Sequence, residues 1–222
     1  GRYRIAAAVS DSTGREISID LNLDATPHQY IPPVTPMGEK KAFGYVVPVV
    51  RGHMSGHVRL DGKSIDLDGV GYHDHNWGHF RDAVWDWGVV HLANDVSILY
   101  GRFASTAKEL SHQPVLFALF DKDGPRPFEL THGYEVKWKG GEPSAVSMHA
   151  RVGQDPLDLK IDVTRQVASE TGAGKQGLFR ADPNARSFFI QMEGTAQLTG
   201  SIDRKKINLE GHAFSETFRL ER

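Results

Sequence analysis

Hydrophobic and polar residues alternate with a period of two in short runs along most of the chain. In residues 16–23, the side chains of Ile17, Ile19, Leu21 and Leu23 fall on one face of an extended strand. Further runs of this kind predict strands at residues 2–9, 43–50, 57–60, 63–70, 84–92, 96–104, 114–121, 133–139, 145–152, 157–165, 187–193, 195–203 and 205–212. A helical period is expected only in short form, near residues 104–111.

The turn-forming residues between these runs predict how the strands are joined. Asp61-Gly62 separates two alternating runs and predicts a hairpin. Four prolines in residues 24–42 predict an irregular connection, and residues 169–186 are expected to form a surface loop. Many short strands with Gly-rich turns predict an all-β architecture of antiparallel barrels. A barrel with a cavity suits one small lipophilic ligand.

Composition excludes several functions. The 222 residues carry a formal net charge of −2 and contain no cysteine, which excludes disulfides, thiolate catalysis and zinc–thiolate sites. No basic face is required by this charge balance, so we expect no nucleic-acid partner. The apolar stretches are too short for a membrane-spanning helix. The compartment is not fixed by these features.

Candidate chemistry is concentrated in the segment Gly71-Tyr-His-Asp-His-Asn-Trp-Gly-His79. On an extended strand its side chains alternate, with His73, His75 and Trp77 on one face and Tyr72, Asp74 and Asn76 on the other. An imidazole beside an indole can transfer a proton or polarise a substrate, and the aromatic faces can stabilise a developing cation. The alternative is a hydrogen-bond network that only fixes a turn.

A metal site is a further alternative for this segment. His73 and His75 offer two ligands on one face, and His79, His91, His53 or His57 could add others. However, no carboxylate occurs from residue 75 to residue 81. We therefore expect no metal and no cofactor.

The string Gly69-Val-Gly-Tyr-His-Asp-His-Asn-Trp-Gly78, followed by Trp85-Asp-Trp-Gly88, resembles the carotenoid 1,2-hydratase (hydroxyneurosporene synthase) and AttH-like family. This lipocalin-like family is also similar to lipocalin-like Diels–Alderases. The resemblance implies two lipocalin-like barrels, with residues 1–80 as the last strands of the first and residues 81–222 as a complete second. The first barrel would then be completed by a second chain or by a missing amino-terminal segment.

The resemblance also implies chemistry without a cofactor, in which an alkene is protonated and the carbocation is captured by water. The implied residues are His75 and Trp77, together with a later Tyr-x-Asp pair that here reads Tyr100-Gly-Arg102. Because Arg stays protonated, Arg102 cannot be the acid; it suits a carboxylate, enolate or carbonyl oxygen. Alternatively, Arg102 pairs with Asp95 or Glu109 on the surface.

We therefore expect a cofactor-independent enzyme, of lyase or isomerase type, that acts on a small isoprenoid or polyketide by hydration, cyclisation or pericyclic closure. The expected catalytic residues are His75, Trp77, Tyr100, Arg102 and Asp74, and the expected ligand-binding residues are Tyr72, His73, Trp85, Trp87 and His91. Trp85 and Trp87 also fit ordinary core packing. The alternatives are a carrier of a hydrophobic ligand and a His-based metalloprotein.

Overall fold

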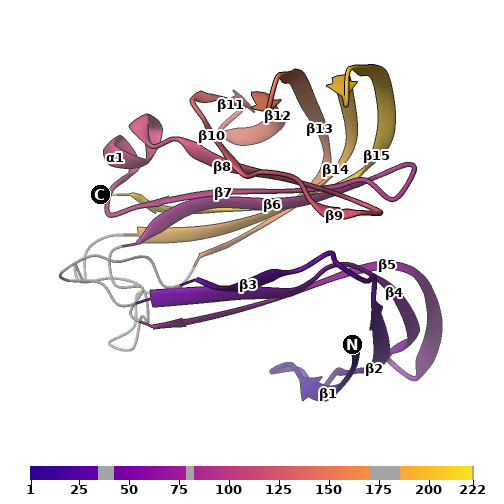
Figure 1. Ribbon diagram of the computed structural model, residues 1–222. Helices are drawn as coiled ribbons and strands as arrows, with labels where there is room; N and C mark the ends of the chain where they lie inside the picture. Colours follow the sequence, from indigo (N-terminus) through magenta and orange to yellow (C-terminus); the bar gives the residue numbers. More distant parts are fainter. Residues whose placement is uncertain (35–42, 79–82, 171–185, 222) are drawn as a thin grey trace. The chain divides into compact units, whose positions relative to one another are not determined.

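The computed structural model describes residues 1–34, 43–78, 83–170 and 186–221, and within them the protein is built almost wholly of antiparallel strands (Figure 1). The first sheet contains β1 (Arg2–Ser10), β2 (Glu16–Ala25), β3 (Ile31–Val34), β4 (Phe43–Leu60) and β5 (Lys63–Gly78). The second contains β6 (Val84–Leu92), β7 (Ser97–Ala104), β8 (Val115–Asp121), β9 (Gly124–Pro125), β10 (Glu129–Thr131), β11 (Gly133–Lys139), β12 (Glu142–Val152), β13 (Asp155–Glu170), β14 (Arg186–Ile202) and β15 (Lys205–Glu221). One short helix, α1 (Ala107–His112), follows β7. The all-β prediction is confirmed.

Several predicted strand ends are wrong. β4 runs unbroken through residues 51–56, where a break was expected, and β5 continues past residue 70 to Gly78. β3 also lies within the predicted irregular connection. Two further differences occur near the end of the described chain. A break was expected at residue 194, but β14 runs through Gly194. A Cβ on Gly194 would lie 2.6 Å from the carbonyl oxygen of Asp162, opposite a bulge between Val163 and Arg165. This glycine therefore permits close backbone approach rather than a turn. The last strand also continues past residue 212, to Glu221. Residues 171–185, most of the predicted loop, lie outside the described residues.

The first sheet curls strongly. Its strand order is β1-β2-β4-β3, with β5 also paired to β4. Although β2 and β4 separate β1 from β5, the rings of Tyr3 on β1 and His73 on β5 lie only 5.2 Å apart. Adjacent strands are spaced about 4.8 Å apart, so these two side chains meet across the inner face of a curved sheet. A Cβ on Gly71 would lie 2.7 Å from both Leu23 and Met54, which places these residues on the same face.

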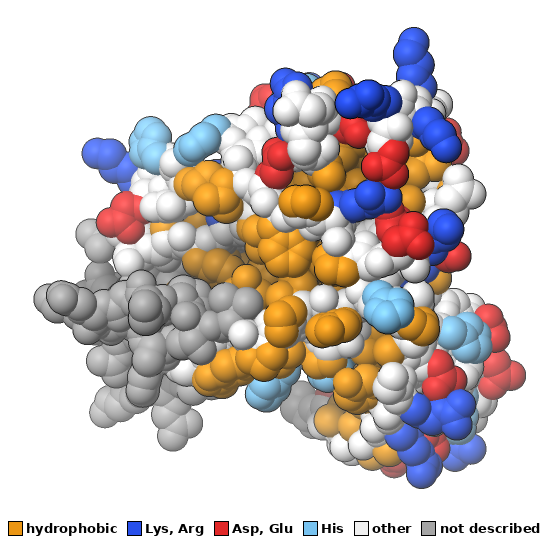
Figure 2. All heavy atoms as spheres, in the orientation of Figure 1, with side chains coloured by type: hydrophobic (Ala, Val, Ile, Leu, Met, Phe, Trp, Pro, Cys, Tyr) orange, Lys and Arg blue, Asp and Glu red, His pale blue; other side chains and the backbone are white. Residues whose placement is uncertain are grey.

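The two faces of the first sheet differ in polarity. Exposed ion pairs join β1 to β2 on the outer face, between Arg2 and Asp24 and between Arg4 and Asp20. In Figure 2, charged side chains gather over this part of the sheet, at the lower right, with hydrophobic side chains exposed beside them. By strand alternation, the inner face of β1, β2 and β5 carries mainly apolar residues, namely Ile5, Val9, Ile17, Ile19, Leu21, Leu23, Ile65 and Leu67.

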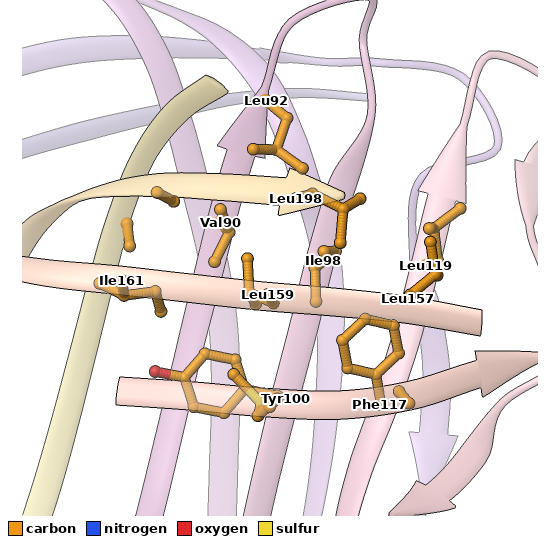
Figure 3. Close-up of a cluster of buried hydrophobic side chains, with 14 of the residues drawn as sticks. Val90, Leu92, Ile98, Tyr100, Phe117, Leu119, Leu157, Leu159, Ile161 and Leu198 are labelled. Atoms are coloured by element: carbon orange, nitrogen blue, oxygen red, sulfur yellow. The ribbon is translucent and has the colours of Figure 1, made fainter. Parts of the chain in front are cut away.

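The second sheet closes on itself around a hydrophobic core. Its order is β10-β8-β7-β6-β15-β14-β13-β12-β11, and Thr131 on β10 donates a hydrogen bond to the carbonyl oxygen of His149 on β12. The two ends of the sheet therefore meet. Alternate residues of its strands fill the interior (Figure 3), including Val90, Leu92, Ile98, Phe117, Leu119, Leu157, Leu159, Ile161 and Leu198.

Contacts divide the chain into two compact units. One consists of Gly1–Thr35 and Gly44–Trp77, and the other of Pro36–Phe43 and Gly78–Arg222. The domain boundary expected at residue 80 falls within residues 79–82, outside the described residues. No helix of the described residues is long and apolar enough to cross a membrane.

Candidate functional site

The motif residues on β5 alternate between the two faces of the first sheet. His75 and Trp77 are stacked on the inner face, with ring centroids 5.9 Å apart and an interplanar angle of 25°. The indole of Trp77 lies against Gly44, where any Cβ would clash with it. A glycine on β4 thus makes room for the tryptophan that supports His75. His75 is exposed, and Trp77 is 38% exposed, so both can be reached by a ligand.

The polar motif residues lie on the opposite face. Tyr72 donates its hydroxyl to Oδ2 of Asp74 over 3.1 Å, and Nδ2 of Asn76 donates to the same oxygen over 3.4 Å. Asp74 is therefore engaged by its neighbours along the strand. The sheet separates it from His75 and Trp77, so the structure does not bring the three predicted catalytic residues of this motif together.

The metal alternative gains no support from the described residues. Among them, no three His, Asp or Glu side chains form a group that could hold a metal ion. His73 contacts Tyr3, and His75 contacts Trp77, so each imidazole has an aromatic neighbour. His79, one of the suggested extra ligands, lies outside the described residues.

Tyr100 on β7 points into the interior that the second sheet encloses. Its ring covers Gly88 on the adjacent strand, where a Cβ would clash with it, and its hydroxyl lies 2.6 Å from Oγ of Ser215 on β15. Burial raises the pKa of Tyr100 well above its ordinary value, because the phenolate would lose its hydration. Tyr100 is therefore a neutral hydrogen-bonding group.

Arg102 also points into the second sheet, and neither predicted surface pairing is present. Its Nε donates to Oδ2 of Asp86 over 2.7 Å, and its Nη1 donates to the carbonyl oxygen of Gln113 over 3.4 Å. Asp86 and Arg102 are direct cross-strand partners on β6 and β7. The suggested pairing with Asp95 or Glu109 is thus replaced by a buried pair on the inner face.

Asp86 has two further partners, both on β15. Its Oδ1 accepts from Nη2 of Arg219 over 2.6 Å and from Oγ1 of Thr217 over 2.9 Å. The side chain of Asp86 is 1% exposed, against 11% for Arg102 and 20% for Arg219. We call Asp86, Arg102, Thr217 and Arg219 the Asp86 cluster.

An aromatic ring covers the Asp86 cluster. The guanidinium carbon of Arg102 lies 4.4 Å from the ring centroid of Tyr134 on β11, which also lies 6.1 Å from the ring of Tyr100. Burial raises the pKa of Tyr134 well above its ordinary value, and the charge of Asp86 adds to that effect. The neutral ring screens the guanidinium from water while offering it a cation–π contact.

The other predicted ligand-binding residues on β6 lie on the outer face of the second sheet. Trp85 stacks on Phe218 at 4.5 Å and donates to Oε1 of Glu216, and Trp87 is buried against Gly101. His91 lies 3.3 Å from the hydroxyl of Ser97. The structure thus separates Trp85, Trp87 and His91 from Tyr100 and Arg102 by the thickness of the sheet.

Sequence reasoning missed Asp86, Tyr134, Thr217 and Arg219. One signal was present, because Asp86 is the charged residue in the otherwise apolar run 84–92. A charge within a buried strand requires a partner. The identity of that partner depends on strand pairing across 133 residues, which the local pattern does not contain.

A polar groove of about 510 Å³ crosses the outer face of β13, β14 and β15. Its lining includes Asp162, Thr195, Gln197, Glu210 and His212. None of the predicted site residues lines it.

No model of a known protein family matches the sequence, and no curated protein matches it. Solved structures do match. An AttH protein (NE1406) of Nitrosomonas europaea aligns over 96% of this chain and 67% of its own, with 16% identity and a TM-score of 0.54. CghA with Sch210972 aligns over 97% of this chain and 68% of its own, with 9% identity and a TM-score of 0.61. A second structure of CghA aligns over 99% of this chain and 69% of its own, with 10% identity and the same TM-score.

The chain has the lipocalin-like fold of AttH and CghA. The predicted lipocalin-like fold is therefore confirmed. Because these structures share only 9–16% sequence identity with the chain, the likeness establishes the fold and not the function. Within this lipocalin-like fold, the motif strand β5 belongs to the first unit, and the Asp86 cluster belongs to the second.

Proposed function

We propose that the protein is a cofactor-independent enzyme that acts on a small lipophilic substrate, of isoprenoid or polyketide type, by hydration, cyclisation or pericyclic closure. The observation that carries this proposal is the inner face of the first sheet, which is apolar, open to solvent and supplied with His73, His75 and Trp77. Val9 is 62% exposed and Ile65 is 52% exposed on this face. Accessible apolar surface of this extent is typical of a ligand- or partner-binding surface.

The side chains on this face suit proton transfer to or from an apolar substrate. The imidazole of His75 is of the side-chain type that most often serves as a general acid or base. The indole of Trp77 presents a π face that would stabilise positive charge developing on a carbon skeleton. Apolar contacts along β1, β2 and β5 would hold the substrate in a reactive orientation.

In the second unit, we propose that Arg102 polarises an oxygen of the substrate and that Tyr100 flanks the reacting portion. Arg102 is held by Asp86 and Gln113, so its orientation is fixed before a ligand arrives. A preorganised donor stabilises developing negative charge without a reorganisation cost.

We also propose that the first sheet is completed by further strands, supplied by a second chain or by a further segment of polypeptide. β1 pairs only with β2 among the described strands, and β5 pairs only with β4, so each has an unpaired edge. Unpaired edges beside an apolar face favour the addition of strands. Light scattering of the purified protein tests the second-chain form of this proposal: a dimer supports it, and a monomer at all concentrations contradicts it.

The test of the enzymatic proposal uses His75→Ala, with His57→Ala as its control. His57 lies on β4 opposite Asp20, on the outer face of the first sheet, and is half-buried. Purified protein is incubated with polyprenols and linear polyenes, and mass spectrometry detects either the gain of one water or a product of unchanged mass and altered retention. We expect His75→Ala to lower turnover about 100-fold or more, with little change in substrate binding, and His57→Ala to retain full turnover. Undiminished turnover in His75→Ala contradicts the proposal, and binding without product in the unaltered protein favours a carrier.

A further inference from the structure

The Asp86 cluster carries more positive than negative charge. Two guanidinium groups, those of Arg102 and Arg219, share the single carboxylate of Asp86. Among the described residues, neither arginine forms an ion pair with another carboxylate. An uncompensated charge in a largely buried position is costly unless a further group of opposite charge or strong dipole offsets it.

Each arginine retains one nitrogen donor that makes no hydrogen bond to the described residues. Arg102 uses Nε and Nη1, and Arg219 uses Nη1 for the carbonyl oxygens of Trp85 and Phe218 and Nη2 for Asp86. Nη2 of Arg102 and Nε of Arg219 therefore have no hydrogen-bond partner in the part of the chain that the structure describes. Guanidinium donors of this kind are well suited to the oxygens of a carboxylate.

A second, independent observation lies on the same inner face. Oε1 of Gln166 on β13 is buried and accepts no hydrogen bond from the described residues. Cross-strand pairing places Gln166 in one row with Met192, Ser215, Gly88 and Tyr100. The adjacent row runs through Ile190, Thr217, Asp86 and Arg102. Gln166 is thus on the same inner face as the two arginines, two strands from Arg219 on β15 and four strands from Arg102 on β7.

We propose that the Asp86 cluster is a binding site for the oxyanion head group, carboxylate or enolate, of a lipophilic ligand. Arg102 and Arg219 donate to the oxyanion, and Gln166 accepts from a hydroxyl or N–H group of the same ligand. Asp86 is a positioning residue that orients both guanidinium groups. This inference rests on the proposed function for the lipophilic nature of the ligand, and it narrows the substrate class to acidic lipophiles.

The first test compares three probes that share one alkyl chain on the unaltered protein: decanoate, decanol and decyltrimethylammonium. Isothermal titration calorimetry at neutral pH measures each affinity. We expect decanoate to bind at least about tenfold more tightly than decanol, since charge-assisted hydrogen bonds are stronger than neutral ones, and the cationic probe to bind most weakly. Equal affinity for decanoate and decanol overturns the proposal, as does a failure of decanoate to bind.

Substitutions then test whether the preference for decanoate over decanol arises at the Asp86 cluster. Arg219→Gln should abolish the preference for decanoate over decanol, whereas Arg165→Gln, which alters an exposed arginine of the same sheet, should preserve it. Gln166→Glu leaves both arginines and their pairing with Asp86 in place and adds a negative charge on β13, where the ligand is proposed to donate a hydrogen bond. It should weaken decanoate at least about tenfold and leave decanol unchanged, so the test remains decisive if Arg219→Gln fails to fold.

A preference that survives both Arg219→Gln and Gln166→Glu overturns the assignment. The enzymatic proposal fails separately, through undiminished turnover in His75→Ala. Head-group preference and turnover are measured on different variants, so the two failures are distinguishable.

Discussion

At the scale of single residues, the carboxylate of Asp86 satisfies three donors from β7 and β15 in a position that water barely reaches. Arg102, Thr217 and Arg219 each donate to one of its two oxygens. Buried ion pairs of this kind gain little over an apolar alternative, but loss of one partner leaves the other charge uncompensated. Removal of Asp86 is therefore expected to be destabilising mainly because it leaves two guanidinium charges without a counter-charge.

We expect Asp86→Asn to lower the free energy of unfolding by about 3–5 kcal/mol, because two partly buried guanidinium groups lose their counter-charge. Urea denaturation followed by circular dichroism measures the change. Asp123→Asn is the control, since Asp123 is exposed and pairs only at 3.8 Å with Lys122, and its effect should stay within about 0.5 kcal/mol. Equal effects of the two substitutions would contradict the structural role given to Asp86.

Tyr100 is expected to make the free energy of unfolding decrease at alkaline pH. Its folded-state pKa lies above that of the unfolded chain because burial disfavours the phenolate. The stabilisation is therefore complete below about pH 10, where the unfolded tyrosine ionises, and is lost as the pH rises above that value. We expect Tyr100→Phe to flatten the decline of unfolding free energy between about pH 9 and pH 11, as measured by urea titration at each pH. A decline as steep as that of the unaltered protein would show that Tyr100 is not its source.

At the scale of elements, the pattern of apolar residues predicted β6 and β11 at their observed bounds, although β6 is buried on both faces and β11 has no fully buried residue. It failed at Gly194, where a glycine marks a bulge in the neighbouring strand instead of a turn. It also failed to give the partner of Arg102, since the suggested Asp95 and Glu109 are near it in sequence, whereas Asp86 is opposite it in the sheet. Local patterns predict which residues form strands, and register decides which side chains meet.

Close packing of β6 on β7 gives a prediction for these two strands. Trp87 occupies the space over Gly101, where a Cβ would clash with the indole. We expect Gly101→Ala to reduce the free energy of unfolding by about 1–3 kcal/mol through overpacking. Gly69→Ala is the control, because no atom lies within 4 Å of a Cβ at that position on β5, and it should be neutral or slightly stabilising. Thermal denaturation of both variants measures the difference; a neutral Gly101→Ala would contradict the packing of Trp87.

At the scale of the whole molecule, the two sheets differ in how completely they bury their apolar side chains. The second sheet closes on itself and buries its core, while the inner face of the first keeps exposed apolar side chains. Only part of the candidate site could be predicted as one constellation: His73, His75 and Trp77 share a face as expected, but Tyr100 and Arg102 belong to the other unit. A linear motif gives the neighbours of a residue along its strand, and it contains no information about the face on which a distant strand presents its own side chains.

The open face of the first sheet leads to a prediction for that unit. We expect Val9→Lys to change the free energy of unfolding by no more than about 0.5 kcal/mol and to reduce the fluorescence of a bound hydrophobic dye, because Val9 is exposed. Leu23→Ala, at a position 1% exposed on the same face, should cost about 2–5 kcal/mol. Dye titration and urea denaturation of both variants provide the measurements. A large loss of stability in Val9→Lys would mean that this face is covered.

The position of β15 in the second sheet has a consequence for synthesis of the chain. β15 pairs with β14 on one side and with β6 on the other, so it joins strands made more than a hundred residues apart on the ribosome. Until β15 emerges, β6 has an unpaired edge and Asp86 lacks Arg219 and Thr217. The early strands of this unit therefore cannot complete their pairing until β15 has been translated. Premature stop codons within β15 should yield insoluble protein rather than a shortened but folded one.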